Sequence, residues 1–259
     1  MQKLRIDAVD HVLRPIVAVR TEYPPGHIIK PHRHRRGQLI SGASGVVILT
    51  TSAGTWMMPP QRGMWIPSAT MHRVRTVGAV SMQSLYIEPN AIPMPPHCQV
   101  VGITPFMRSL MTEALSLPAE YDLKGRAGAL MELIQHEMQQ LPVLPLSLQY
   151  PADGPLAKRC RIFIEKPNIH ETIDDWSDAL GMSRRTFTRF FRRETGQSFA
   201  AWRQQACLMS ALPRLAAGAS VTIVALDLGY ENPAAFTLMF KRAFGSSPLA
   251  YLGLRQKHR

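Results

Sequence analysis

The sequence of 259 residues has no long apolar run, few cysteines and fewer acidic than basic residues. No segment approaches the roughly 20 consecutive apolar residues that cross a bilayer, and the N-terminal MQKLRIDAVD lacks the apolar stretch of a secretory signal. The three cysteines, Cys98, Cys160 and Cys207, are scattered and odd in number, which argues against a disulfide framework. We therefore expect a cytoplasmic protein with no membrane partner.

The net charge of +12 is unevenly distributed along the chain. The stretch Pro155–Arg259 contains 16 lysines and arginines against 8 acidic residues, whereas the longer stretch before it carries less excess positive charge. A basic C-terminal part favours a polyanionic partner. The alternative is charge that serves solubility alone.

Residues 1–92 are expected to form a small antiparallel β-barrel or sandwich. Short apolar runs such as RPIVAVR, GVVILTT and GTWMMPP alternate with glycine and proline at regular spacing. We expect the large apolar side chains of this region in its core rather than in a pocket, namely Trp56, Met57, Met58, Met64, Trp65 and Met82.

A helical segment is expected over residues 93–141, followed by a linker over residues 142–154. Apolar residues recur at helical spacing in the segment: Leu123, Ala127, Leu130, Ile134 and Leu141. This stripe has two interpretations, packing against the barrel or a helix-to-helix contact in a homodimer. The linker LPVLPLSLQYPADGP is rich in proline and cannot continue a helix.

The remaining residues, 155–259, contain an internal repeat. WSDALGMSRRTFTRFFRRETGQSF aligns with VALDLGYENPAAFTLMFKRAFGSSP, at an offset of 48 residues that becomes 49 within the turn. Each copy predicts a short helix, a glycine turn and a second helix, so we expect two helix-turn-helix motifs at about 172–195 and 221–245.

Residues of both copies are suited to the ends of their second helices. Ser183 and Asn232 are favourable N-caps because their side chains accept from exposed backbone N–H groups. Pro233 suits the first helical position, where its missing N–H has no helical partner to lose. Gly196 and Gly245 suit the left-handed residue that follows a helix end. These residues therefore predict where the second helix of each copy begins and ends.

The exposed sides of these two helices differ. In the first copy, one stripe carries Arg184, Arg185, Thr188, Arg189 and Arg192. Arginine binds guanine through two acceptors, so we expect this copy to read bases; the alternative is a solvated charged surface. In the second copy the candidate DNA-contacting residues are Ala234, Thr237 and Leu238, which are suited to contact thymine methyl groups. Lys241 and Arg242 are suited to bind phosphates.

The two repeat segments resemble the AraC/XylS family of bacterial transcription regulators over roughly Pro155–Leu252. The resemblance implies a seven-helix domain that binds double-stranded promoter DNA, generally to recruit RNA polymerase. Two residues depart from the family. Cys207 stands where the family commonly has arginine, and Pro213 falls in the helix expected to link the motifs, where it is expected to interrupt or kink the helix and alter the motif spacing.

A second resemblance lies in the N-terminal region. The spacing of Gly26, His32, His34, Gln38 and Gly45 is similar to that of the first cupin motif, and PSATMH (67–72) is similar to the second, with Ala69 in place of the usual glycine. His32 and His34, two residues apart, would point to one side of a strand. The resemblance implies that His32, His34, Gln38 and His72 converge inside the barrel. These four residues are therefore the candidate metal ligands.

Three neutral imidazoles suit zinc, nickel, copper, cobalt or iron(II). Glutamine replaces the usual glutamate of metal-binding cupins, which argues against an iron oxygenase and leaves Gln38 as a weak fourth ligand or a partner of a ligand. The alternative is that the histidines contact an organic effector or one another.

We therefore predict an α+β multidomain protein: a cupin-like sensor barrel, a helical dimerisation segment and an all-α domain with two helix-turn-helix motifs. The predicted function is sequence-specific transcription regulation in response to a small molecule or metal ion, without catalytic residues. Two alternatives stay open, a constitutive DNA-binding regulator whose barrel only dimerises and a metal-dependent cupin enzyme.

Overall fold

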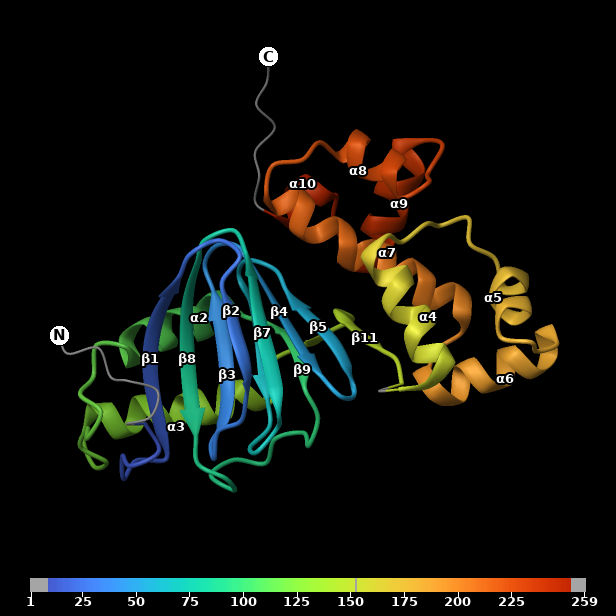
Figure 1. The fold of residues 1–259 in the computed structure, drawn as a ribbon. Helices are drawn as coiled ribbons and strands as arrows, with labels where there is room; N and C mark the ends of the chain where they lie inside the picture. The colour runs from blue at the N-terminus through green and yellow to red at the C-terminus, as the bar shows by residue number, and fades with distance from the viewer. Residues whose placement is uncertain (1–8, 152, 253–259) are drawn as a thin grey trace, which may run out of the picture. The chain divides into compact units, whose positions relative to one another are not determined.

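The computed structural model describes residues 9–151 and 153–252. Contacts divide the chain into two compact units, one of Met1–Thr51 and Trp56–Pro145 and the other of Ser52–Thr55 and Leu146–Arg259. Figure 1 shows that strands dominate the first unit and helices the second. The α+β class predicted from the sequence is confirmed. No described helix is both long and apolar enough to span a membrane.

The first unit consists of two antiparallel sheets. Its strands are β1 (Ile16–Tyr23), β2 (Ile28–His32), β3 (Gly37–Gly42), β4 (Val46–Thr51), β5 (Gly54–Met58), β6 (Arg62–Ile66), β7 (His72–Val77), β8 (Val80–Ile87), β9 (Gln99–Gly102) and β10 (Val143–Leu144). One sheet has the order β1-β8-β3-β6-β9-β10, and the other contains the order β5-β4-β7-β2. Alternating burial follows from the two-residue period of a strand, most clearly in β7, where exposed arginines alternate with buried residues.

Two helices, α2 (Pro105–Ala114) and α3 (Arg126–Gln139), cover the first of these sheets. Met131, Ile134 and Met138 of α3 are buried in one cluster with Leu39 and Leu85 of the sheet. Of the expected apolar stripe, Ile134 and Leu141 are buried in this cluster and Ala127 and Leu130 are half-buried against it, whereas Leu123 precedes the helix and is 54% exposed. The expected core side chains Trp56, Met57, Met58, Met64, Trp65 and Met82 are all buried.

The predicted linker contains two short strands that the sequence did not lead us to expect, β10 and, in the second unit, β11 (Ser147–Gln149). In β10, Val143 pairs with Val101 and Leu144 with Val100. In the second unit, the indole Nε1 of Trp202 donates to the Gln149 carbonyl at 2.7 Å. The helical segment ends before the prolines, as expected. The extended chain between the prolines forms short paired strands.

Seven helices form the described part of the second unit: α4 (Gly154–Glu165), α5 (Ile173–Ala179), α6 (Arg184–Thr195), α7 (Phe199–Ala216), α8 (Val221–Asp227), α9 (Pro233–Phe244) and α10 (Pro248–Tyr251). This number agrees with the implied seven-helix domain. α7 is continuous through Pro213 to Ala216. The expectation that this proline would interrupt the linking helix is therefore wrong. Pro213 lies in the last turn, where its missing N–H leaves one helical acceptor, the Met209 carbonyl, without its partner, and little of the helix follows it.

The cysteines of both units are free and buried. Burial raises the pKa of the Cys98, Cys160 and Cys207 thiols to about 12. These side chains therefore act as small apolar groups of the core, and Cys207 fills the position where arginine was expected from the family.

Candidate functional site

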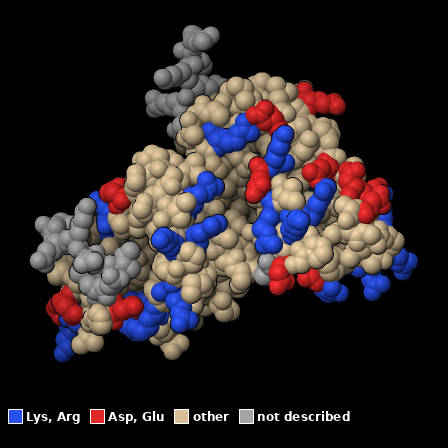
Figure 2. All heavy atoms as spheres, in the orientation of Figure 1, with Lys and Arg blue, Asp and Glu red and all other residues tan. Residues whose placement is uncertain are grey.

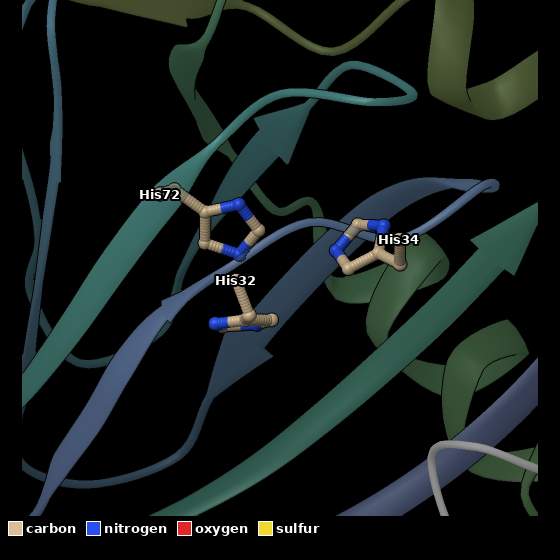
Figure 3. A group of neighbouring side chains, drawn as sticks. All are labelled: His32, His34 and His72. Carbon is tan, nitrogen blue, oxygen red and sulfur yellow. The ribbon is translucent and has the colours of Figure 1, made fainter.

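The first candidate site is a group of three imidazoles inside the barrel. One ring nitrogen each of His32, His34 and His72 lies within 4.8 Å of the others, and Figure 3 shows the three rings facing one another. The ring centroids of His32 and His72 are 4.3 Å apart and those of His34 and His72 are 5.2 Å apart. The three histidines chosen from the motif spacing are therefore neighbours in the fold.

The expected cause of this arrangement was wrong in one respect. β2 ends at His32, so His34 is not in the strand and simple alternation does not place the two rings on one side. His32 pairs with His72 across β2 and β7, after a register shift between Ile29 and His32. The chain leaves the strand after His32, and His34 lies in the irregular stretch that follows, ahead of the bend at Arg35 and Arg36.

Ala69 is hydrogen-bonded to the backbone of His34. Its backbone N–H donates to the His34 carbonyl at 2.9 Å, which joins the loop before β7 to the loop after β2. Ala69 has a φ of 58°, a left-handed conformation that costs a residue with a Cβ about 1–2 kcal/mol. The position therefore suits glycine, the residue usual in the second cupin motif, and alanine is retained at some cost in strain.

Each of the three rings has one nitrogen against a backbone carbonyl oxygen. The Nδ1 atoms of His32, His34 and His72 lie 2.9, 2.5 and 2.8 Å from the carbonyls of Lys30, Arg36 and Thr70 respectively. A carbonyl oxygen only accepts, so each Nδ1 must carry the proton and donate it. In the neutral form, each Nε2 then holds a lone pair.

Burial favours the neutral form of two of these rings. Burial lowers the pKa of His72 to about 4, and repulsion from His32 and His34 contributes to this decrease. The pKa of His34 is also lowered, mainly by burial. Neutral imidazole is the form that binds metal ions.

Gln38 contacts the histidine group directly. Its side-chain oxygen lies 3.0 Å from Nε2 of His34, an atom that does not donate while Nδ1 carries the ring proton, and its amide nitrogen donates to Ser84 Oγ at 3.0 Å. Tyr86 contacts His34 edge-on, with ring centroids 5.6 Å apart. Ser84 and Tyr86 were not anticipated; their spacing of two residues in β8 was the available signal, because such residues share one side of a strand.

The cavity beside these side chains is small. Its volume is about 30 Å³, and its lining includes His32, Gln38, His72, Ser84 and Tyr86. A cavity needs about 10–15 Å³ of such space to hold one water molecule. A single ion fits it in this conformation, and an organic effector of ordinary size does not.

A larger pocket lies elsewhere in the same unit, at the proline-rich segment after β8. Its volume is about 540 Å³, within the range of small-molecule sites. Trp65, Ile87, Glu88, Ile92 and Met94 are among its lining residues. The sequence did not reveal this pocket, because its walls come from separate strands and a loop.

The second candidate site is the exposed side of α6. Ser183 caps this helix by accepting from the Thr186 N–H, and Gly196 ends it with a φ of 73°. The expected DNA-contacting residues Arg184, Arg185, Thr188, Arg189 and Arg192 are all exposed. Figure 2 shows basic side chains along the edge of the second unit where α6 lies.

The partners of these arginines differ. Arg184 forms an ion pair with Asp174 at 3.3 Å. Arg185, Arg189 and Arg192 form no salt bridge with any residue that the structure describes. Their guanidinium groups are therefore available to an external anion or acceptor.

The second motif has the same ends and a different surface. Asn232 caps α9 by accepting from the Ala234 N–H, Pro233 is in the first turn, and Gly245 ends the helix with a φ of 78°. The expected contact residues Ala234, Leu238, Lys241 and Arg242 are exposed, and Thr237 is half-buried. This surface offers cations only at the end of the helix.

Comparison with known proteins identifies both units. Residues 176–253 match the model of a helix-turn-helix domain, and residues 14–96 match that of an AraC-like ligand binding domain. The HTH-type transcriptional regulator NimR of Escherichia coli is 32% identical over 221 residues, which cover 85% of this chain and 81% of that protein.

Two solved structures are also similar. The DNA-binding domain of AdpA in complex with a target DNA is 32% identical over 39% of this chain and 92% of that chain, with a TM-score of 0.37. ToxT from Vibrio cholerae is 9% identical over 94% of this chain and 99% of that chain, with a TM-score of 0.38.

Proposed function

Because the chain belongs to the AraC family of DNA-binding transcription regulators and has an AraC-like ligand-binding domain, we propose that its effector is a divalent transition metal ion bound by His32, His34 and His72. The observation that carries the proposal is the set of three Nδ1 contacts to backbone carbonyls, which leaves an Nε2 lone pair on each ring. Metal-binding histidines generally donate their other ring N–H in this way.

The chemistry of the donor set supports a late first-row ion. Neutral imidazoles suit zinc, nickel, copper, cobalt and iron(II). The cavity of about 30 Å³ favours one ion over an organic molecule at this position. Gln38 would then be a weak neutral ligand, because its side-chain oxygen lies beside the Nε2 atom of His34 that would bind the ion.

The metal content of the untagged full-length protein tests this proposal. We expect one ion per chain by mass spectrometry, and its loss in a His32→Ala/His34→Ala variant. The matched control is His97→Ala/His136→Ala, which removes two exposed histidines and should retain the ion. Wild-type protein that takes up no zinc, nickel, cobalt or iron(II) would disprove the proposal.

A second substitution tests the role of the amide. Gln38→Glu places a carboxylate beside His34, and a negatively charged oxygen binds a divalent cation better than a neutral amide does. We expect tighter zinc binding in a competition titration with a chelator. Unchanged affinity would show that the side chain at position 38 does not reach the ion.

The three-histidine donor set fits a regulatory role better than it fits oxygenase activity. Iron(II) oxygenases of the usual kind bind the metal through two histidines and one carboxylate, whereas the group found among the described residues consists of three histidines. The enzyme alternative predicts turnover of a small substrate by the metal-loaded protein, and we expect none.

An organic effector is the second candidate, favoured by the pocket of about 540 Å³ beside Trp65. A ligand there should change the fluorescence of the protein and be excluded by Met94→Trp, which fills the pocket. If the metal is absent and this pocket binds a ligand, the pocket rather than the histidine group is the sensor.

We propose that the effector changes how a homodimer presents its DNA-binding units to promoter DNA and hence how it recruits RNA polymerase. Sedimentation with and without zinc tests whether the protein is a homodimer. Promoter footprints with and without zinc test whether the effector changes how the protein binds promoter DNA. Identical footprints in both states would leave DNA binding constitutive and the barrel without a sensory role.

A further inference from the structure

A long segment of the barrel contains no acidic residue. Between Glu22 and Glu88 there are 65 residues with no aspartate or glutamate and with seven lysines or arginines. The four β-strands β2, β4, β5 and β7, which lie side by side in one sheet, all belong to this segment. The charge of this sheet is therefore of one sign.

Four of the seven cations form what we call the basic face: Lys30 in β2, Arg33 directly after β2, and Arg73 and Arg75 in β7. All four are exposed. Arg73 and Arg75 share the outer side of β7 because the residues between and beside them are buried. β2 is the neighbouring strand, with Ile28 opposite Arg75 and Ile29 opposite Val74.

The basic face has no internal counter-charge among the described residues. None of its four cations forms a salt bridge there, whereas Arg35 and Arg36 of the same segment are both paired with Glu88. Like charges on adjacent strands destabilise a sheet. An array that is retained without acidic partners is electrostatically suited to an external polyanion.

We propose that the basic face binds the phosphate backbone of DNA that flanks the site held by the helix-turn-helix motifs. Charge complementarity selects the partner: arginine and lysine on an exposed surface are the groups that contact phosphates without reading sequence. The motifs bind DNA within the same chain, so any flanking duplex is present at high effective concentration. Weak contacts at the face are then sufficient.

An anionic membrane is the competing polyanion, and the exposed Ile28 and Met71 near the face are compatible with it. Membrane-binding basic clusters generally accompany an amphipathic or membrane-spanning helix. The basic face lies on β-strands and an adjoining loop, and no described helix could span a membrane. The DNA backbone is therefore the better match. Figure 2 shows several basic side chains on the visible side of this unit, with acidic ones toward its margin.

The salt dependence of DNA affinity tests the proposal. Full-length protein is titrated against two duplexes of 25 and 60 base pairs that share one core sequence, enriched from random DNA by the wild-type protein. The test variant is Lys30→Gln/Arg73→Gln/Arg75→Gln. The matched control, Arg108→Gln/Lys124→Gln/Arg126→Gln, removes three exposed cations from the α2–α3 region of the same unit.

On the 60-base-pair duplex, we expect the slope of log affinity against log salt concentration to fall by about 2.7 in the test variant, at about 0.9 for each phosphate that the variant no longer neutralises. The slope on the 25-base-pair duplex and both slopes of the control variant should not change. A test variant with wild-type slopes on both duplexes would overturn the proposal, provided its thermal midpoint is that of the wild type.

Two further outcomes also overturn the proposal. If the slope falls as much in the control variant as in the test variant, the effect is that of net charge and not of the basic face. If DNA slopes are unchanged but flotation with vesicles containing phosphatidylserine is abolished only in the test variant, the face belongs to a membrane. The assays use metal-free protein in parallel with zinc-loaded protein, so failure of the metal proposal does not affect this result.

Discussion

The two helix-turn-helix motifs have similar frameworks and different exposed surfaces. Both recognition helices, α6 and α9, run for 12 residues from a polar N-cap to a left-handed glycine. In both, two phenylalanines four residues apart are fully buried, Phe187 and Phe191 in one and Phe236 and Phe240 in the other. The comparison shows that the fold constrains the buried side of a repeat and leaves its exposed side free to acquire a separate role.

The surrounding cores differ more than the helices. Phe191 contacts Trp176, Phe199 and Trp202 at centroid distances of 6.0, 5.5 and 5.7 Å. Phe240 contacts Phe244 and Tyr251 at 4.6 and 5.6 Å. The first motif therefore has tryptophans in its core, and the second has smaller aromatic rings near the end of the described chain.

The largest expected effect is on stability and should be shared by both motifs. Phe191→Ala and Phe240→Ala each remove a buried ring, so each should cost about 3–5 kcal/mol of unfolding free energy. Urea denaturation followed by circular dichroism measures both. A cost below about 1 kcal/mol in only one variant would show that the two frameworks are not energetically equivalent.

The next effect should separate the motifs. Arg185→Ala/Arg189→Ala removes from α6 two exposed arginines that form no salt bridge within the described part of the chain, and each bidentate base contact is worth about 1–3 kcal/mol of discrimination. Thr237→Ala/Leu238→Ala is the counterpart in α9 and should change discrimination less, because neither side chain can grip a base through two hydrogen bonds. Fluorescence anisotropy with selected and scrambled duplexes gives the comparison, and a larger effect of the α9 variant would reverse the assignment.

Phosphate binding should be more evenly divided. Arg192→Gln/Arg193→Gln and Lys241→Gln/Arg242→Gln change equivalent positions at the two helix ends. We expect each pair to reduce the salt slope of DNA affinity by at most about 1.8, at about 0.9 for each phosphate left without its cation, and the α9 pair to leave sequence preference unchanged. A change in preference would identify one of these residues as a base reader.

The smallest effect should be nearly equal in the two motifs. Ser183→Ala and Asn232→Ala each remove a side-chain acceptor for a backbone N–H of the first turn, at a cost of about 1 kcal/mol. Thermal unfolding of each variant against wild type tests this. Equality would sharpen the comparison, because it would confine the difference between motifs to their exposed side chains.

Features of the fold that depend on local chemistry could be predicted from the sequence. Caps such as Ser183 and Gly196 require only their own backbone and side chain, and the structure has them where expected. The short strands β10 and β11 could not be predicted, because strands of two or three residues have no measurable alternation and form only when a partner is nearby.

The sequence could identify the residues of the histidine group but not how they are arranged. Motif spacing identified His32, His34 and His72, yet His34 lies beyond the end of β2 and joins the group from an irregular stretch rather than through strand alternation. The carbonyl partners of the three rings, and the contact of Gln38 with His34, depend on backbone positions that no residue type encodes. Burial of the apolar stripe in α3 likewise required knowledge of the sheet beside it.

Pro213 gives α7 a mechanical property that its neighbours in the second unit lack. Proline has no N–H, so the carbonyl of Met209, one turn earlier, loses its helical partner. A helix that lacks one such bond bends at lower energy there than elsewhere. Since α7 joins the two motifs, we expect this chain to accept operators whose half-sites differ slightly in separation, with elastic deformation of the protein replacing strain in the DNA.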